Sequence, residues 1–470
     1  MEQTTKPVAG QDSRRDFIKK TATAAAAVAA ANVLKTPIYG QGQAPSANVA
    51  GANNKLTVGY IGVGGQGMAH VRSQKTHAGE NNIEQVAVCD VWKKRVEGAK
   101  AFVGGRCEGY DDYRKMLDRK DIDTVCIATV DHWHAKCSID AMNAGKHVYV
   151  EKPMTRYLGE AWEVYDTCKK TGKVLQVGSQ GCSDRKWHVA AEKIRAGKIG
   201  PLVLGQDSYM RNNPKGEWNY TIDPDAKEDN LDWKYWRGPV QHIDTKNFSA
   251  DQYFRWRKYS PFCAGVLGDL FPHRLHPLML ATGNPELPVR VVSVGNKKIH
   301  TDEKTPGTYM RTVPENVQLL AEFPSGLCLM VISSTVNETG IESMMRGHYG
   351  TLYFAGNRVE LRPEKAFADE VDPERVDGIE PGEDIRWHEK NWFAAIRGTE
   401  KANCGIDLAI KVQTVISLAE MSERLGVAAY WDEKTRKIYT GGPGGPDLKN
   451  EIKPLSYELE EYMGARIRKV

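Results

Sequence analysis

A glycine-rich turn between a short apolar strand and a helix constrains this chain more than any other feature. Residues 55–61 (KLTVGYI) have the character of a buried strand, and Gly62-Val63-Gly64-Gly65-Gln66-Gly67 follows at once, matching G-x-G-x-x-G. A helix-like stretch then runs to about residue 74, and a second apolar strand, 84–89, ends in Asp90. Asp90 lies roughly 20 residues after Gly67, the spacing expected of a dinucleotide-binding unit.

Each position of this turn has a physical role. Gly62 permits the tight turn, Gly64 lets the backbone approach a pyrophosphate, and Gly67 lets helix and strand pack closely. The start of the helix, at Gly65 and Gln66, is expected to face the phosphates.

Asp90 bears on the choice of cofactor. We expect its carboxylate to accept hydrogen bonds from ribose hydroxyls, which favours NAD, because a carboxylate repels the 2′-phosphate of NADP. NADP remains the alternative cofactor, since Lys93, Lys94 and Arg95 follow closely. We interpret these three cations as a solvated helix face.

Strands and helices continue to alternate up to about residue 177. Strand-like runs at 123–128, 147–150 and 174–177 are separated by helix-like stretches at 133–144 and 159–171, with Gly145 as a C-cap. Alternation of this kind predicts a parallel sheet, so that the N-terminal part is an α/β Rossmann fold. We assign residues 55–175 to this NAD(P)-binding domain and 176–470 to a second domain.

The first forty residues have the layout of a transport signal. Ser13-Arg14-Arg15-Asp16-Phe17-Ile18-Lys19 precedes an Ala-rich, weakly apolar stretch from Ala22 to Val33, as in a twin-arginine signal. A basic turn before an Ala-rich helix is the alternative. We predict a signal peptide over 1–40, a linker over 41–54 and a periplasmic or otherwise extracytoplasmic location. Because this route exports folded proteins, we expect the cofactor to be tightly bound.

Composition argues against several other classes of protein. The net charge of +4 is small for 470 residues, and no run of 18 apolar residues occurs, so neither nucleic acid nor a membrane span is expected as a partner. The first cysteine is Cys89, which is too late for a lipid anchor. The nine cysteines include no C-x-x-C pair, so we predict neither a disulfide framework nor a metal site.

Several motifs together give the chain a family resemblance. They are Asp131-His132-Trp133-His134, Glu151-Lys152-Pro153, Val177-Gly178-Ser179-Gln180, Trp236-Arg237-Gly238-Pro239 and the stretch from Gly265 to His273 (GVLGDLFPH). From about residue 55 to the C-terminal region, the chain resembles the Gfo/Idh/MocA family, the relatives of glucose–fructose oxidoreductase and inositol dehydrogenase. The resemblance implies a nicotinamide-dependent oxidoreductase that acts on a sugar, a polyol or a sugar derivative.

The same resemblance implies an α+β second domain for substrate binding and oligomerisation. It is expected to contain an open, mostly antiparallel sheet, one face of which packs on the first domain or on another subunit of a dimer or tetramer. Strand-like runs at 289–296, 317–323, 327–334 and 351–354 agree with this. Helix-like stretches at 387–397 and 406–424 are expected to cover a sheet edge or return to the first domain.

The resemblance assigns catalytic roles to three residues. Lys152 is expected to reach the reacting hydroxyl, His273 to act as general acid/base, and Asp269 to orient it or bind substrate. A histidine titrates near neutral pH, and a carboxylate fixes its tautomer, so this pair suits proton transfer. Pro153 is a candidate cis-proline that would re-aim the lysine.

The catalytic segment departs from the family at two positions. A continuous helix would put Asp269, His273 and His276 on one face, with Pro272 harmless only in the first turn. His276 stands where many relatives carry Asp, which leaves the substrate open, and Val130 stands where relatives often carry proline.

Other residues are expected to contact the ligands. Beside Lys152, the cofactor candidates in or near these motifs are Thr129, His132, Glu151, Gln180, Trp236 and Arg237. Beside the catalytic residues, the substrate candidates are Arg211, Tyr259 and His276. The segment 218–259 interleaves aromatic residues with arginines, and it either stacks on a sugar or fills its own core or an oligomer interface.

Two further functions compete with the oxidoreductase. One is a redox-neutral glycosidase that retains NAD, oxidises a ring hydroxyl transiently, eliminates the glycosidic group, adds water and returns the hydride. The other is a non-catalytic sugar-binding or sensor module, against which the complete set of Lys152, Asp269 and His273 argues.

Overall fold

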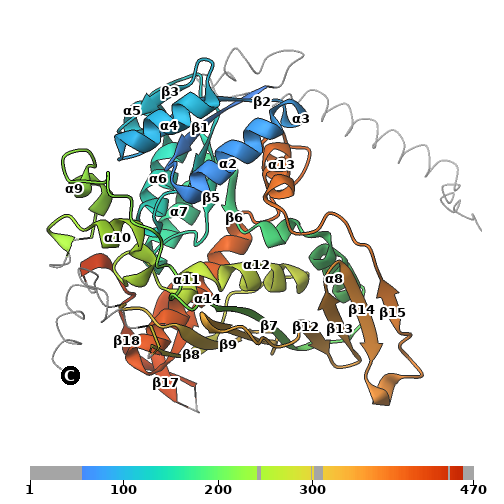
Figure 1. Ribbon diagram of the computed structural model, residues 1–470. Helices are drawn as coiled ribbons and strands as arrows, with labels where there is room; N and C mark the ends of the chain where they lie inside the picture. The colour runs from blue at the N-terminus through green and yellow to red at the C-terminus, as the bar shows by residue number, and fades with distance from the viewer. Residues whose placement is uncertain (1–54, 241–244, 298, 301–310, 443–444, 459–470) are drawn as a thin grey trace, which may run out of the picture. The chain divides into compact units, whose positions relative to one another are not determined.

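A computed structural model describes residues 55–458 except 241–244, 298, 301–310 and 443–444 (Figure 1). From Lys55 onward the chain forms one compact unit. The predicted signal peptide over 1–40 and the linker over 41–54 lie outside the described residues.

The N-terminal part of this unit is a parallel sheet with helices on both faces. Its elements are β1 (Leu56–Ile61), α2 (Gly65–Thr76), α3 (Ala78–Asn81), β2 (Ile83–Cys89), α4 (Lys93–Val103), β3 (Glu108–Tyr110), α5 (Tyr113–Leu117), β4 (Thr124–Ile127), α6 (Asp131–Asn143), β5 (His147–Glu151), α7 (Leu158–Thr171) and β6 (Leu175–Gly178). The strand order is β3-β2-β1-β4-β5-β6, and all pairs are parallel. This confirms the predicted Rossmann fold.

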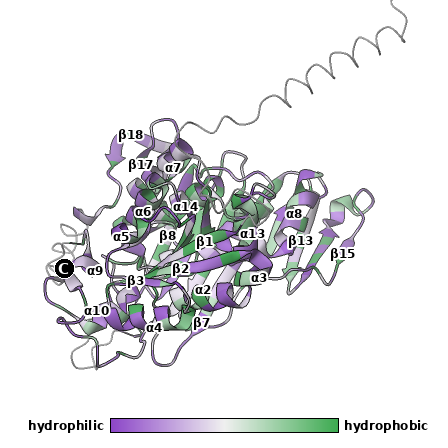
Figure 2. Ribbon diagram, turned by 90° about the horizontal axis from the view of Figure 1, so that it is seen from above, coloured by the Kyte–Doolittle hydropathy of each residue, from purple (hydrophilic) through white to green (hydrophobic). Residues whose placement is uncertain are grey.

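Burial explains why the strands of this domain read as apolar runs. Every residue of β1 and β4 is buried, as expected where helices cover both faces of a parallel sheet. Figure 2 shows β1 in hydrophobic colours between more hydrophilic outer helices such as α4. The edge strand β3 was not predicted, because its three residues are partly or fully exposed and make no apolar run. The first sheet extends through β6, three residues past the predicted boundary at 175.

The second sheet is larger and mixed. The elements that follow β6 are η1 (Gln180–Ser183), α8 (Arg185–Arg195), β7 (Leu202–Asn212), α9 (Trp233–Arg237), α10 (Ala250–Phe254), η3 (Trp256–Lys258), α11 (Val266–Asp269), α12 (Pro272–Ala281), β8 (Arg290–Asn296), β9 (Asn316–Glu322), β10 (Cys328–Ser334), β11 (Val336–Asn337), β12 (Met344–Gly347), β13 (Gly350–Ala355), β14 (Arg358–Pro363), η4 (Lys365–Phe367), β15 (Glu374–Val376), α13 (Ile385–Ile396), α14 (Ile406–Leu425), β16 (Ala428–Asp432), β17 (Lys437–Gly442) and β18 (Gly445–Ile452). In the described part of the chain it has twelve strands, with β15-β14-β13-β12-β7-β10-β9-β8-β16-β17-β18 in order and β11 beside β7. Apart from the parallel pair β10 and β7, its strands are antiparallel, which confirms the predicted open sheet.

Helices join the two sheets into one body. Helices α12 and α14 lie on one face of the second sheet, between it and the first domain (Figure 1). Helix α13 returns to the first domain, where Trp392 and Phe393 pack in the same cluster as Val58 and Tyr60 of β1. Across the described ranges, no helix combines the length and the apolar character needed to span a bilayer.

We predict that folding stability falls as the pH drops from 6.5 towards 4. Burial lowers the pKa of His132 and His273 to about 3 and that of His147 and His388 to about 4, so the unfolded chain takes up these protons first. The stability that is present above pH 6.5 is therefore lost through this window. Glu160 acts in the opposite direction, because burial raises its pKa to about 7 and the folded chain takes up this proton first. We expect a loss of about 1–3 kcal/mol per pH unit in urea unfolding.

The matched variant for this prediction is His147→Asn. In the wild type, Val174 N donates a hydrogen bond to His147 Nδ1 at 3.0 Å. The amide oxygen of asparagine can accept the same hydrogen bond, so the fold is expected to survive. The variant should show a shallower dependence on pH. A stability that stays constant or rises on acidification would show that the buried histidines do not control it.

Candidate functional site

The glycine-rich turn has two positions that only glycine fits. Gly62 has a φ of +83°, and a Cβ there would lie 2.7 Å from Ala128 O, the carbonyl that follows β4. A Cβ on Gly67 would lie 1.9 Å from Gly62 O. Around Gly65, in contrast, a Cβ would meet nothing within 4 Å. The N-terminus of α2 is therefore open to a ligand, as required for a site that binds a pyrophosphate.

Asp90 holds the turn as well as facing the cavity. Its Oδ2 accepts a hydrogen bond from Val63 N at 3.0 Å, and its Oδ1 accepts one from Trp92 N at 3.0 Å. A carboxylate has about four acceptor positions, so it can still bind ribose hydroxyls.

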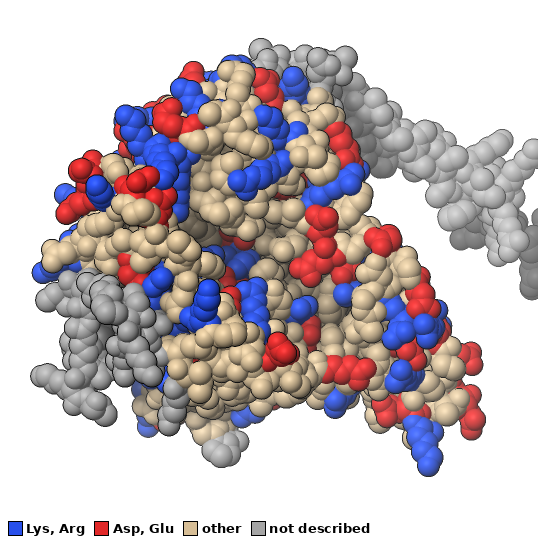
Figure 3. Space-filling view, viewed as in Figure 1, with Lys and Arg blue, Asp and Glu red and all other residues tan. Residues whose placement is uncertain are grey.

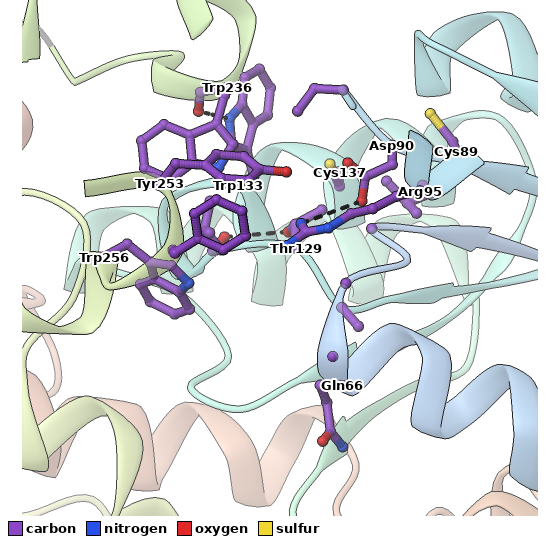
Figure 4. A pocket seen from close by; sticks show the side chains of 18 of the residues that line it. Gln66, Cys89, Asp90, Arg95, Thr129, Trp133, Cys137, Trp236, Tyr253 and Trp256 are labelled. Atoms are coloured by element: carbon purple, nitrogen blue, oxygen red, sulfur yellow. Dashed lines mark hydrogen bonds and ion pairs between the residues drawn. The ribbon is translucent and has the colours of Figure 1, made fainter. Parts of the chain in front are cut away.

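A cavity of about 450 Å³ begins at this turn (Figure 4). Gly62, Gly64, Gly65, Gln66 and Asp90 line one side, together with Thr129. The other side comes from the aromatic segment, which contributes Tyr220, Tyr235, Trp236, Tyr253, Phe254, Trp256 and Arg257.

The interpretation of residues 93–95 as a solvated helix face is wrong for Arg95. Its guanidinium lies in the cavity, 3.9 Å from Asp90 Oδ2 and 4.9 Å from the ring centre of Tyr253 (Figure 4). The aromatic rings attract the cation, which explains why it lies against them with 28% of its side chain exposed. Lys94 remains exposed and binds Asp223 and Asp225.

The aromatic segment packs a core of its own and forms a wall of the cavity. Trp233, Trp236 and Tyr253 share a buried cluster with Trp92, which precedes α4. The sequence left open whether the aromatic residues stack on a sugar or fill a core or an interface, and the structure shows that they fill a core. The exposed aromatic faces line the cavity that begins at the glycine-rich turn.

Lys152 and Asp269 meet where the two domains join. The Lys152–Pro153 bond is cis, as predicted, and Lys152 Nζ donates to Asp269 Oδ1 at 2.6 Å and to Asp269 O at 2.9 Å. Arg257 Nε donates to the same Oδ1 at 2.9 Å, and Trp218 Nε1 donates to Oδ2 at 3.1 Å. Burial alone would raise the pKa of Asp269, but Lys152 and then Arg257 hold it far below its usual value. Asp269 is therefore a permanent anion between two cations.

His273 lies close to this group on a separate helix. Pro272 occupies the first turn of α12, and Leu270 and Phe271 separate this helix from α11, so the segment is not one continuous helix. Burial, and next the charge of Lys152, lower the pKa of His273 to about 3. Its ring stacks on Tyr209 at 5.3 Å, and it is neutral at physiological pH. A neutral imidazole can accept a proton.

The remaining cofactor candidates are spread around the cavity. His132 Nε2 lies 2.9 Å from the backbone oxygen of Trp236, so His132 anchors the aromatic wall instead of lining the cavity. Arg237 lines a neighbouring cavity on the other side of Asp90. Gln180 is half-buried at the start of η1. Glu151 Oε1 accepts from Gln66 Nε2 at 3.1 Å, directly beneath the turn.

One of the three additional substrate candidates lies near the catalytic residues, and the other two lie away from the cavity. Arg211 is near His273, because its Nη2 donates to the hydroxyl of Tyr209 at 3.0 Å. The hydroxyl of Tyr259 donates to Asp251 inside the aromatic core. His276 is buried on the far side of α12, where its Nδ1 donates to Pro272 O at 2.9 Å. Neither Tyr259 nor His276 lines the cavity.

Sequence reasoning missed three residues of the site. Arg257 and Trp218 bind Asp269, and Tyr209 stacks on His273. Arg257 and Trp218 were visible only as members of an aromatic segment with arginines. Tyr209 lies in β7, and no motif marks it.

The site fits a dinucleotide. The open helix N-terminus, the acid that ends β2 and the adjoining cavity provide for a pyrophosphate, a ribose and a base. No group of metal ligands occurs among the residues that the structure describes. Fold and site together define a two-domain, dinucleotide-binding protein.

Figure 3 shows the molecule hollowed between the two domains, with Lys and Arg side chains in the hollow.

Comparisons with known proteins agree with this class. Residues 56–179 match the Gfo/Idh/MocA family model, described as an oxidoreductase family with an NAD-binding Rossmann fold. Alpha-N-acetylgalactosaminidase of Shewanella oneidensis is 29% identical over 229 residues, 44% of this chain and 49% of that protein. The chain thus spans about half the length of the curated relatives it matches.

Solved structures show the same fold over most of the chain. Levoglucosan dehydrogenase in complex with NADH and levoglucosan has a TM-score of 0.61 and 19% identity, covering 80% of this chain and 98% of that one. The WlbA dehydrogenase from Bordetella pertussis, in complex with NADH and UDP-GlcNAcA, has a TM-score of 0.60 and 17% identity, covering 80% and 99%.

We predict that Arg95→Met weakens NADP binding about tenfold and NAD binding less than about threefold. Arg95 is the cation beside Asp90, so a 2′-phosphate would meet it, whereas NAD has no charge at that position. Calorimetric titration of both dinucleotides measures the two affinities. Lys94→Met, which lies outside the cavity, is the control and should change neither. An equal loss for both dinucleotides would contradict the role of Arg95 in discrimination.

Proposed function

We propose that this chain is an NAD-dependent oxidoreductase that acts on a sugar, a polyol or a sugar derivative and retains its cofactor. The observation that carries the proposal is the buried Lys152–Asp269 pair, which Arg257 connects to the cavity that begins at the glycine-rich turn. The match of residues 56–179 to an NAD-binding oxidoreductase family supports it.

The charges of the site assign a role to each catalytic residue. His273 is neutral and accepts the proton of the substrate hydroxyl. Lys152 donates a hydrogen bond to the oxygen as negative charge develops on it. Asp269 orients Lys152, and Arg257 and Trp218 orient Asp269. A bound nicotinamide supplies the hydride acceptor.

Residues near the turn would hold that cofactor. Gly65 and Gln66, at the start of α2, face the pyrophosphate, and Asp90 binds the adenosine ribose. The aromatic side chains of Trp236, Tyr253 and Trp256 line this cavity and would shield a bound dinucleotide from water. Such a wall would also slow release of the dinucleotide, as a retained cofactor requires.

A redox-neutral glycosidase is the second candidate. The specific observation in its favour is the similarity to alpha-N-acetylgalactosaminidase. The same residues would serve it, because transient oxidation of a ring hydroxyl makes the same demands on Lys152 and His273. The net reaction would release a sugar without net reduction of the cofactor.

A paired assay separates these functions. Purified protein is incubated with free sugars and with glycosides, without and then with added NAD, while nicotinamide absorbance and released sugar are followed together. We expect a sustained rise in absorbance on a free sugar. Sugar release without reduced cofactor would establish the glycosidase instead. Lys152→Met should lower either activity at least about 10³-fold while dinucleotide binding persists. Full activity in this variant would exclude the proposed mechanism.

We also propose export by the twin-arginine route and assembly into a dimer or tetramer. The segment from Ser13 to Val33 supports export. Assembly is supported by one face of the second sheet, where Val292 and Leu320 are paired, Val294 lies nearby, and all three are exposed. The described residues place α12 and α14 on the opposite face.

We predict that Val294→Glu lowers the mass measured by light scattering to that of a smaller assembly. Val294 is 69% exposed, and a charge there would be buried unpaired in an interface. Phe102→Glu, on the exposed side of α4, is the control and should leave the mass unchanged. A wild-type protein that is monomeric at all concentrations would refute the assembly.

A further inference from the structure

A buried histidine with a carboxylate on each side lies below the glycine-rich turn and is not used by the mechanism described so far. His70, in α2, is fully buried. Its Nε2 lies 2.9 Å from Glu151 Oε1, and its Nδ1 lies 2.7 Å from Glu389 Oε1. The three residues come from α2, β5 and α13, so they join the first domain to a helix more than 200 residues further along the chain.

With both carboxylates ionised, the geometry gives His70 both ring protons. An ionised carboxylate only accepts hydrogen bonds, so a ring nitrogen without a proton would place its lone pair against an oxygen lone pair. A cation between two anions leaves one net negative charge, whereas a neutral histidine would leave two buried anions with only Lys152 acting on one of them. Although burial opposes the charge, the hydrogen bonds with Glu151 and Glu389 favour it, and the pKa of His70 lies well above its usual value.

The two carboxylates differ in what else they bind. Glu389 accepts from Ser73 Oγ and from Gln74 Nε2, both in α2. Glu151 accepts from Gln66 Nε2, which lines the cavity, and from the backbone N of Lys152 at 3.2 Å. The Glu151 end of the triad therefore touches both the dinucleotide turn and the catalytic lysine.

Other groups around the triad leave its charge balance unchanged. Tyr149 packs edge-on against His70 at 4.9 Å, and burial raises the pKa of Tyr149, of Tyr60 and of Cys126, so these three are neutral. His388 and His273 are also neutral, since burial lowers their pKa to about 4 and about 3. The cations that act on Glu151 are His70 and Lys152, and together they hold its pKa at about 2 against the effect of burial.

We propose that His70 is a positioning residue, an imidazolium that keeps Glu151 ionised and thereby holds Gln66 in the dinucleotide site and Lys152 in the catalytic site. The inference rests on the proposed function for the roles of Gln66 and Lys152. His70 itself touches neither substrate nor cofactor and acts through Glu151.

The test is the affinity for NAD of the full-length protein as a function of pH. In His70→Gln, the amide leaves one neutral donor towards Glu151 but removes the cation, so the buried carboxylate is expected to titrate in the neutral range. A protonated Glu151 no longer accepts from both Gln66 and Lys152 N. NAD binding should then be close to that of the wild type at pH 8 and at least about tenfold weaker at pH 6. The wild-type affinity should change less than about threefold over this range.

Two matched variants separate positioning from a loss of structure. His77→Gln replaces the other histidine next to α2, whose Nδ1 lies 2.8 Å from Ser73 O, away from both carboxylates, and should bind NAD like the wild type. Glu389→Gln keeps an oxygen acceptor for His70 and leaves the cation paired with Glu151, so its NAD affinity should remain independent of pH. A loss of affinity in His70→Gln that is equal at pH 6 and pH 8 would overturn the proposal, because it would indicate a merely structural role.

A second measurement does not depend on cofactor binding. ¹⁵N NMR of histidine-labelled apoprotein at pH 7.5 should show one buried histidine with both ring nitrogens protonated, and this signal should be missing from the spectrum of His70→Gln. If His70→Gln does not fold, a change of the same signal in Glu389→Gln assigns it to His70. A neutral tautomer for His70 overturns the inference. If the wild type binds no dinucleotide, the proposed function fails, while the NMR result still decides whether His70 is the cation that the triad requires.

Discussion

The salt bridge between Lys152 and Asp269 is the interaction on which the rest of the site depends. Lys152 follows the carboxyl end of β5 in the first domain, and Asp269 ends α11 in the second, 117 residues away. Both side chains are about 10% exposed, so the pair has to offset a large loss of hydration. It does so through further donors, with Arg257 on the same oxygen of Asp269 and Trp218 on the other. One buried anion thus links the two domains at the site and orients the side chains around it.

Local sequence patterns were sufficient for the strands of the first domain apart from β3, but for only four of the twelve strands described in the second sheet. Apolar runs of four to seven residues, interrupted by helices, identify β1, β2, β4, β5 and β6, because a sheet covered on both faces tolerates few polar residues. Alternating runs identify β8, β9, β10 and β13, which have one open face. The edge strand β3 and the short helices of the aromatic segment escaped prediction, since they have neither periodicity nor sufficient length. The other eight strands of the second sheet, among them the long central strand β7, were also not predicted.

The site was predictable where it depends on motifs and not where it depends on packing. Lys152, Asp269 and His273 come together as the resemblance implied, and the glycine-rich turn has the predicted form. His276 is buried, its Nδ1 bonds to Pro272 O, and it does not line the cavity, which its spacing from Asp269 and His273 along the chain does not reveal. Arg95 lies in the cavity because rings distant in the sequence attract it, and Arg257 and Tyr209 are likewise defined by contacts that no local pattern contains.

The sharing of Asp269 Oδ1 by two cations has a consequence for what happens when Lys152 changes its hydrogen-bond partner. If Lys152 turns its hydrogen bond towards a ligand, Asp269 keeps its ion pair with Arg257 and its hydrogen bond from Trp218. The carboxylate is then not left as a solitary buried charge, and its surroundings need little reorganisation. Arg257 thus acts as a standing counterion, which compensates Asp269 while the lysine contacts another group.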